Sequence, residues 1–304
     1  MASITTDGNF TSKSSAGVNL FFSALNIFLA IPASLGNALI LIALHKVSSI
    51  HPPTKLFFRC LAVTDLCVGL VVHPLFATIQ LSRITGVSKN NLFYIDEVSR
   101  VTNWILCAVS VLTLTAISVD RLLALLLGLR YRHVVTLRRV RVAIFCFWFI
   151  GACVGSTRKW RTDITLVLAS VFLALSLVTS IFCYTRIHIK LRHRQVQHQN
   201  SFPLRQTTGG GIPLNLARYK KSVSSILWVQ LTLLACYIPW VLVAFLFITG
   251  IENDRGVAWM VTTTLVRLNS TLNPILYCWK IREVRQAVKA TVKRRNCFFF
   301  FLDN

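Results

Sequence analysis

The sequence LFFSALNIFLAIPASLGNALILIAL occupies residues Leu20–Leu44, and none of its 25 residues carries a charge. A helix of about 20 apolar residues spans the roughly 30 Å hydrocarbon core of a bilayer. Inside a bilayer every backbone N–H and C=O group needs a partner within the protein, and a helix pairs these groups within one segment. This stretch therefore predicts a membrane-spanning helix.

Six further apolar stretches follow along the chain. They cover residues 56–80, 101–127, 141–155, 164–187, 223–249 and 257–279, and the stretch at 141–155 is the shortest. Hydrophobic residues make up 54% of the 304 residues and charged residues only 14%, whereas a soluble domain carries about 25% charged residues. The predicted fold is all-α: a seven-transmembrane helix bundle over residues 20–279, surrounded by the lipid bilayer.

Lysine and arginine decide the orientation of the bundle, because they accumulate on the cytoplasmic side of a membrane. The connections after the first, third and fifth stretches and the C-terminal tail together hold 23 of the 33 Lys and Arg residues, and the opposite side holds eight. The N-terminus is therefore expected outside the plasma membrane. This distribution also accounts for the formal net charge of +23, so we expect no nucleic-acid partner.

The two ends of the chain carry candidate modification sites. Residues 1–19 are expected to form an extracellular tail, in which the sequon at Asn9 is a glycosylation candidate. Residues 280–304 are expected to be cytoplasmic, and Ile281–Val292 alternates basic and apolar residues as an amphipathic surface helix does. Cys297 precedes four phenylalanines and is a palmitoylation candidate, although an unmodified apolar tail fits the same pattern.

Four polar residues at membrane depth form a candidate cation site. Asp65 lies within the second stretch, Ser110 within the third, and Asn269 and Asn273 within the seventh. The two asparagines are four residues apart and so share one helix face. A buried carboxylate surrounded by amides and hydroxyls can stay ionised by binding a small hard cation such as sodium. The alternative is a hydrogen-bond network that only holds the helices together.

Other residues indicate moving parts. Asp120 and Arg121 stand at the inner end of the third stretch, where an acid and an arginine can neutralise each other. Once released, the guanidinium offers five donors to carbonyl groups of a docking protein, but the pair could also simply end a span. Pro239 and Pro274 interrupt the hydrogen bonds of the sixth and seventh helices, which produces hinges or inert kinks.

Taken together, these residues resemble the rhodopsin-like G-protein-coupled receptors over nearly the whole chain. The matching pieces, in the order of that family, are Gly36-Asn37, LAVTD (Leu61–Asp65), DRL (Asp120–Leu122), Trp148, Tyr184, CYIP (Cys236–Pro239) and LNPILY (Leu272–Tyr277). The resemblance implies a receptor that passes an extracellular signal to a heterotrimeric G protein. The resemblance also implies that the protein is not an enzyme and that it needs no cofactor, although an allosteric sodium ion could bind.

The resemblance also implies roles for individual residues. Asp65, Ser110, Asn269 and Asn273 correspond to the sodium pocket of the family. Arg121 corresponds to the arginine that contacts the G protein and is held inactive by Asp120. Tyr184 and Tyr277 correspond to the tyrosines that move inward on activation, and Leu129–Tyr131 to a loop that touches the G protein.

Several positions depart from the family pattern. No cysteine occurs in an outer loop, and Asp96 stands where the family has the cysteine of the outer disulfide bond. Ser176 replaces a proline, Tyr237 a tryptophan, and Leu122 a tyrosine. The missing bridge and the short loop at about 156–163 are similar to the melanocortin, cannabinoid and adenosine receptor neighbourhood. The departures leave open a protein with the receptor fold that does not signal.

The residues expected around the outer pocket do not identify the ligand, and a peptide, a nucleoside and an acidic lipid are the candidates. Asn103 replaces the acid that amine receptors use, and Arg267 replaces the lysine that binds retinal, so neither ligand is expected. Arg267 is a candidate clamp for a carboxylate or phosphate, unless it pairs with Glu97 or extends to the membrane surface. Asp96 and Glu97 could instead bind a basic peptide or a divalent cation. Tyr237 bounds the pocket from the sixth span.

Other membrane-protein functions fit the sequence less well. A transporter or channel usually carries paired charges along its path or repeated halves, and Asp65 and Arg267 are the only central charges. An intramembrane enzyme needs a metal-ligand set or a nucleophile with a base at membrane depth, and no such set is present. His73 is a lone histidine next to Pro74, for which we expect a structural role.

Overall fold

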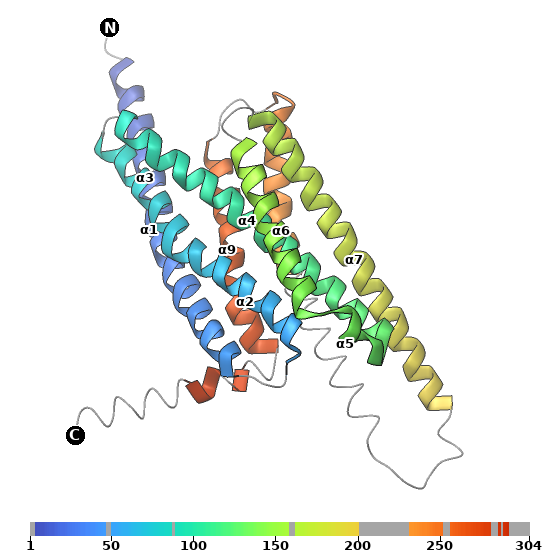
Figure 1. Ribbon diagram of the computed structural model, residues 1–304. Coiled ribbons are helices and arrows are strands. Elements are labelled where there is room, and N and C mark those ends of the chain that lie inside the picture. The colour runs from blue at the N-terminus through green and yellow to red at the C-terminus, as the bar shows by residue number, and fades with distance from the viewer. Residues whose placement is uncertain are drawn as a thin grey trace, which may run out of the picture.

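The computed structural model describes residues 4–46, 50–86, 89–157, 162–200, 231–251, 256–280, 285–286 and 288–291. Across these ranges the regular elements are all helical. They are α1 (Ile4–Lys46), α2 (Pro52–Cys67), the π-helical turn η1 (Val68–Val72), α3 (His73–Thr85), α4 (Lys89–Leu127), the 3-10 turn η2 (Gly128–Arg130), α5 (Tyr131–Val134), α6 (Leu137–Thr157), α7 (Thr162–Asn200), a helix over Leu231–Ile248, and α9 (Val257–Lys280). Figure 1 shows the long helices side by side in one bundle.

The expected spans correspond to these helices. In the described parts of the chain, six helical segments are long and apolar enough to cross a membrane, and α2, η1 and α3 together form one of them. The seventh span is α9, which has 24 residues and includes Pro274. It packs against α1 and α2, so the fold is the predicted seven-helix bundle.

Two helices extend beyond the apolar stretches that predicted them. α6 begins at Leu137, before the predicted stretch 141–155, and so adds Arg138 and Arg139 in its first turn, where their exposed side chains reach the inner side. α1 begins at Ile4, and its helix continues through residues expected in the outer tail. Of the expected surface helix at the C-terminus, only 285–286 and 288–291 are described, and Lys46 Nζ donates to Thr291 Oγ1 there at 3.2 Å.

Small residues allow the helices to approach closely, as is common in membrane bundles where packing drives association. A Cβ atom added to Gly36 would lie 2.9 Å from Pro274, so α1 and α9 touch at this glycine. Gly155 of α6 similarly faces the side chain of Ile105 on α4, at 2.7 Å from an added Cβ. The central core lies along α4, where Val109 and Ile117 are buried. Large apolar side chains such as Phe145 and Leu175 are exposed and face the lipid.

The second span contains the π-helical turn η1 between α2 and α3. A π-helical turn holds one residue more than an α-helical turn, and such turns often occur at functional sites. η1 packs against α1 at Gly69, where an added Cβ would lie 2.5 Å from Ser34 Oγ. After this turn, α3 places His73 inside the bundle and Phe76 at the wall of a cavity.

Candidate functional site

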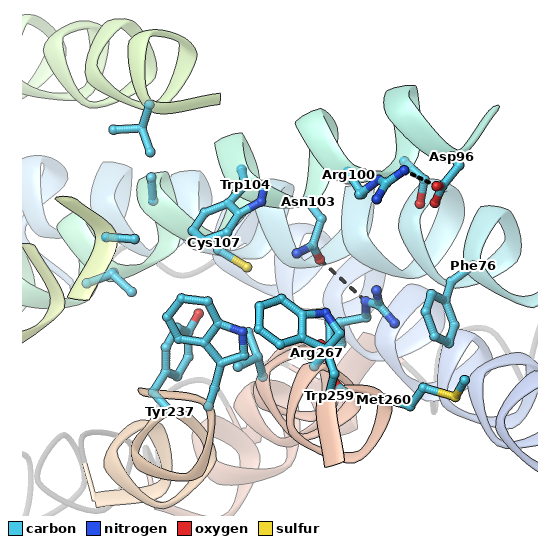
Figure 2. Close-up of a pocket in the computed structure, with 18 of the residues that line it drawn as sticks. Phe76, Asp96, Arg100, Asn103, Trp104, Cys107, Tyr237, Trp259, Met260 and Arg267 are labelled. Atoms are coloured by element: carbon cyan, nitrogen blue, oxygen red, sulfur yellow. Dashed lines mark hydrogen bonds and ion pairs between the residues drawn. The ribbon is translucent and has the colours of Figure 1, made fainter. Parts of the chain in front are cut away.

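A cavity of about 190 Å³ lies between α3, α4, α6, α7, α9 and the helix Leu231–Ile248. Four of the five residues predicted around a ligand line it: Asp96, Asn103, Tyr237 and Arg267. Glu97 does not line it. In Figure 2, Trp104 and Tyr237 lie on one side of Arg267, and Arg100, Asp96 and Phe76 lie on the other.

Three tryptophans form an aromatic wall that the sequence analysis did not identify. The ring centroids of Trp104 and Trp240 are 5.5 Å apart, and those of Trp240 and Trp259 are 6.2 Å apart, both with rings edge to face. All three line the cavity. They come from α4, the helix Leu231–Ile248 and α9. Because these helices are far apart in the sequence, no sequence pattern indicates that the three tryptophans meet.

Arg267 lies deep in the bundle and is 5% exposed. Its Nε donates to Asn103 Oδ1 at 3.4 Å and its Nη1 to Asn26 Oδ1 at 3.4 Å. Its guanidinium carbon lies 3.9 Å from the centroid of the Phe76 ring. Within the part of the chain that the structure describes, no carboxylate lies within 4.0 Å of this guanidinium.

Asn26 is held in place by His73. His73 Nδ1 lies 2.9 Å from Asn26 Oδ1, which also accepts from Arg267. Since that oxygen acts as an acceptor, His73 Nδ1 must carry the proton. Both residues are fully buried. The expected structural role of His73 therefore includes positioning a neutral acceptor beside Arg267.

The outer acids are already paired on their own helix. Arg100 forms an ion pair with Asp96, and its Nε lies 3.9 Å from Glu97 Oε2. Arg100 stands one turn after Asp96, so this pairing follows from helical spacing. Glu97 thus lies near Arg100 and does not pair with Arg267. A basic ligand could pair with Asp96 only by displacing Arg100 from it.

Two of the four residues expected to bind a cation, Asp65 and Asn273, contact each other between α2 and α9. Asn273 Nδ2 donates to Asp65 Oδ2 at 2.8 Å, and Asn37 Nδ2 donates to the carbonyl oxygen of Ser270 at 3.0 Å. The side chain of Ser110 bonds instead to Thr64, with 2.9 Å between the two hydroxyl oxygens.

Four side-chain oxygens in this region are buried without a hydrogen-bond partner. They belong to Asp65 (Oδ1), Asn37, Asn269 and Asn273. A buried oxygen without a donor is costly, and carboxylate and amide oxygens are ligands that hard cations prefer. These four oxygens are therefore suitable ligands for a small cation such as sodium.

The inner end of α4 holds a buried network that we call the latch, formed by Asp120, Arg121, Thr54 and Tyr131. Arg121 Nη2 lies 2.5 Å from Asp120 Oδ2 and 2.6 Å from Thr54 Oγ1. Thr54 Oγ1 donates to Asp120 Oδ2 at 2.8 Å, and the Tyr131 hydroxyl donates to Asp120 Oδ1 at 2.6 Å. Asp120 is 2% exposed. The latch joins α2, α4 and α5, and the sequence analysis assigned no part in it to Thr54 or Tyr131.

The remaining predicted residues are placed as follows. Tyr184 is buried on α7, 3.2 Å from Ser118 Oγ of α4. Pro239 lies inside the helix Leu231–Ile248 and Pro274 inside α9. Tyr277 belongs to α9 and Asn9 to α1, but their side chains are not described. Cys297 lies outside the described residues.

Comparison with known proteins identifies the class of the chain. The family described as "7 transmembrane receptor (rhodopsin family)" matches residues 36–158 and 152–277. Melanocortin receptor 4 of Danio rerio is 26% identical over 286 residues, covering 89% of this chain and 83% of the relative. Melanocortin receptor 5 of Rattus norvegicus is 27% identical over 309 residues, covering 95% and 91%. Adenosine receptor A3 of Ovis aries is 26% identical over 297 residues, covering 90% and 89%.

The matched region includes the latch, the Asp65 region and the outer cavity. Its position agrees with the resemblance drawn from the sequence motifs, and the melanocortin and adenosine receptors were both in the neighbourhood that the departures indicated. The chain belongs to the rhodopsin family of seven-transmembrane receptors, and it is a G-protein-coupled receptor of the plasma membrane and not an enzyme.

Proposed function

We propose that a ligand in the outer cavity activates a heterotrimeric G protein by opening the latch between Asp120 and Arg121. The observation that carries the proposal is the latch itself: Asp120 and Thr54 bind Arg121 directly at the inner end of α4, and Tyr131 donates to Asp120. A guanidinium released from such a network has five N–H donors for carbonyl groups of a docking protein.

The mechanism is a shift between two populations of the receptor. The cavity contacts α3, α4, α6, α7, α9 and the helix Leu231–Ile248, so a bound ligand can change how these helices pack. Pro239 removes one backbone hydrogen bond from the helix Leu231–Ile248, and we propose that the inner half of this helix swings outward there. Arg121 then leaves Asp120, and Tyr184 and Tyr277 move toward the opening.

A sodium ion held by Asp65, Asn269 and Asn273 stabilises the resting state in this proposal. Support comes from the oxygens of these residues that are buried without donors. Ser110 contacts Thr64 and not Asp65, so its part in ion binding is indirect. The ion supplies positive charge next to the Asp65 carboxylate.

The ligand classes to be tested are peptides, nucleosides and acidic lipids. The names of the relatives support the peptide and nucleoside classes, because one group of relatives is named for melanocortin and the other for adenosine. The proposal does not include retinal or amines. Arg267 stands in the cavity where retinal would need a lysine, and Asn103 stands where an amine would need an acid.

Recruitment of each Gα class in intact cells tests the proposal. Wild type is compared with Arg121→Ala, at rest and with the ligand panel. Arg138→Ala is the matched control, because Arg138 is an exposed arginine at the inner end of α6. We expect recruitment that disappears in Arg121→Ala at equal surface level and persists in Arg138→Ala. Recruitment that is the same in all three proteins would contradict the latch, and no recruitment by any of them would favour a receptor fold that does not signal.

A further inference from the structure

We propose that the outer cavity selects an anionic ligand with a flat or elongated apolar body, whose acid pairs with Arg267 and whose body lies against Trp104, Trp240 and Trp259. The inference deepens the proposed function, since it takes the cavity to be the ligand site. It rests on the surroundings of Arg267, on the charges around the cavity and on the aromatic wall.

Arg267 lacks a counter-charge in the described structure. Its two side-chain acceptors are neutral amide oxygens at 3.4 Å, which is longer than the usual 2.7–3.2 Å of an N–H···O hydrogen bond. Its third close neighbour is the face of Phe76. A buried cation costs free energy unless it is paired, so the site is complete only when an anion reaches it.

The neutral oxygens around Arg267 are held in place by other residues of the bundle. His73 donates to Asn26 Oδ1 and so turns the amide oxygen toward Arg267, while Asn103 supplies the second oxygen from α4. Both oxygens orient the guanidinium without cancelling its charge. His73 and Asn26 are therefore positioning residues for the anion site.

The other charges around the cavity favour the same sign of ligand. Arg83 and Arg100 line it together with Arg267, and among the described lining residues Asp96 is the one acid. Asp96 already forms an ion pair with Arg100. A cationic ligand would meet the positive charge of Arg267 without a free acid to balance its own charge.

The far end of the cavity selects an apolar body. The three tryptophans and Phe172 present ring faces and edges beyond Arg267, and aromatic or aliphatic groups pack well against such walls. The connection between α6, which ends at Thr157, and α7, which begins at Thr162, is four residues long. An acid joined to an aryl or long alkyl group fits both ends of the cavity.

Two substitutions at Asn103 test the missing counter-charge without any ligand. Asn103→Asp places a carboxylate where Nε of Arg267 now meets an amide, and Asn103→Ser removes the amide without adding charge. In the purified full-length receptor we expect a higher thermal midpoint for Asn103→Asp than for Asn103→Ser. An equal or lower midpoint would show that Arg267 needs no anion and would overturn the proposal.

Binding of matched probes tests the ligand class. The probes are 2-naphthaleneacetate and oleate, each paired with its uncharged amide, and dodecyl phosphate, which separates phosphate from carboxylate recognition. Truncating one partner of a buried, hydrogen-bonded charge pair costs about 2 kcal/mol or more, so Arg267→Gln should weaken acid binding at least about 30-fold. Asn103→Asp should weaken acid binding similarly and more than Asn103→Ser does, because only the aspartate adds a negative charge that competes with the ligand for Arg267. The amides should bind wild type and the three variants equally weakly.

An acid and its amide that bind wild type equally well would overturn the proposal, and so would acid binding that survives Arg267→Gln. These readouts do not involve a G protein. Acid binding without Gα recruitment would therefore contradict the proposed function alone. Gα recruitment by a neutral ligand, at the same potency in wild type and Arg267→Gln, would contradict this inference alone.

Discussion

Tyr131→Phe removes one oxygen atom from the latch and leaves the aromatic ring in place. The Tyr131 hydroxyl donates to Asp120 Oδ1 at 2.6 Å, whereas Thr54 and Arg121 both donate to Oδ2. Tyr131 is 8% exposed, so water has little access to replace the lost donor. A hydrogen bond to a charged group contributes about 1.5–3 kcal/mol, and the closed latch should lose at least about 1.5 kcal/mol.

A loss of about 1.5 kcal/mol in the closed state raises the ratio of open to closed receptors about tenfold. A receptor that is about 1% open at rest would then be about 10% open. The assay is Gα recruitment in intact cells without ligand, at matched surface level. Tyr94→Phe is the control, because Tyr94 lies exposed at the outer end of α4.

Unchanged recruitment by Tyr131→Phe would refute this reasoning, because it would mean that the hydroxyl is bonded equally well in both states. Reduced recruitment would indicate that Tyr131 contacts the G protein, as the position of Leu129–Tyr131 in the family suggests. Thr54→Val should also raise basal recruitment. Since Thr54 and Tyr131 share Asp120, their effects in the double variant should not simply add.

Three further predictions concern the ion site, the helix packing and His51, whose ring lies next to Tyr131 of the latch. Asp65→Asn should abolish the stabilisation of the purified receptor by sodium relative to choline, and sodium dependence that persists would contradict the ion site. Gly69→Ala should cost about 1–3 kcal/mol of stability through overpacking, because its Cβ would meet Ser34 of α1. Gly17→Ala, which has open space around it within α1, should not lower the thermal midpoint, because alanine favours a helix more than glycine does. Burial lowers the pKa of His51, which packs on Tyr131, below the usual 6.5, so the unfolded state takes up the proton first as the pH falls below about 6.5. Wild type should therefore lose more stability than His51→Gln between pH 7.5 and 5.5, and parallel pH curves would rule this out.

The spans were predictable because the length of an apolar helix is set by the bilayer. The prediction was least accurate where polar residues continue a helix. The arginines at the start of α6 stay helical because their side chains are exposed at the inner face, and a search for apolar residues stops before them. The turn η1 could not be predicted from the sequence, because the pattern VGLVV is equally typical of an ordinary apolar α-helix.

The charged members of the site were visible in the sequence because charge at membrane depth is rare and costly. Asp65, Asp120 and Arg267 all stood out for this reason. Their neutral partners did not, since Thr54, Asn26 and Trp240 are ordinary residues until helices distant in sequence bring them together. Arg267 is the clearest case: the sequence left an internal partner open, and only the packing shows two amides and a ring around it.

The turn η1 divides the second span into two halves with different tasks. α2 carries Thr54 of the latch and Asp65 of the ion site, whereas α3 carries Phe76 and Gln80 of the cavity. One residue rotates an α-helix by about 100°, so gaining or losing a residue at η1 would present a different face of α3 to the ligand while α2 kept its place. The signalling half of the receptor and its choice of ligand can therefore diverge independently, with five residues as the joint between them.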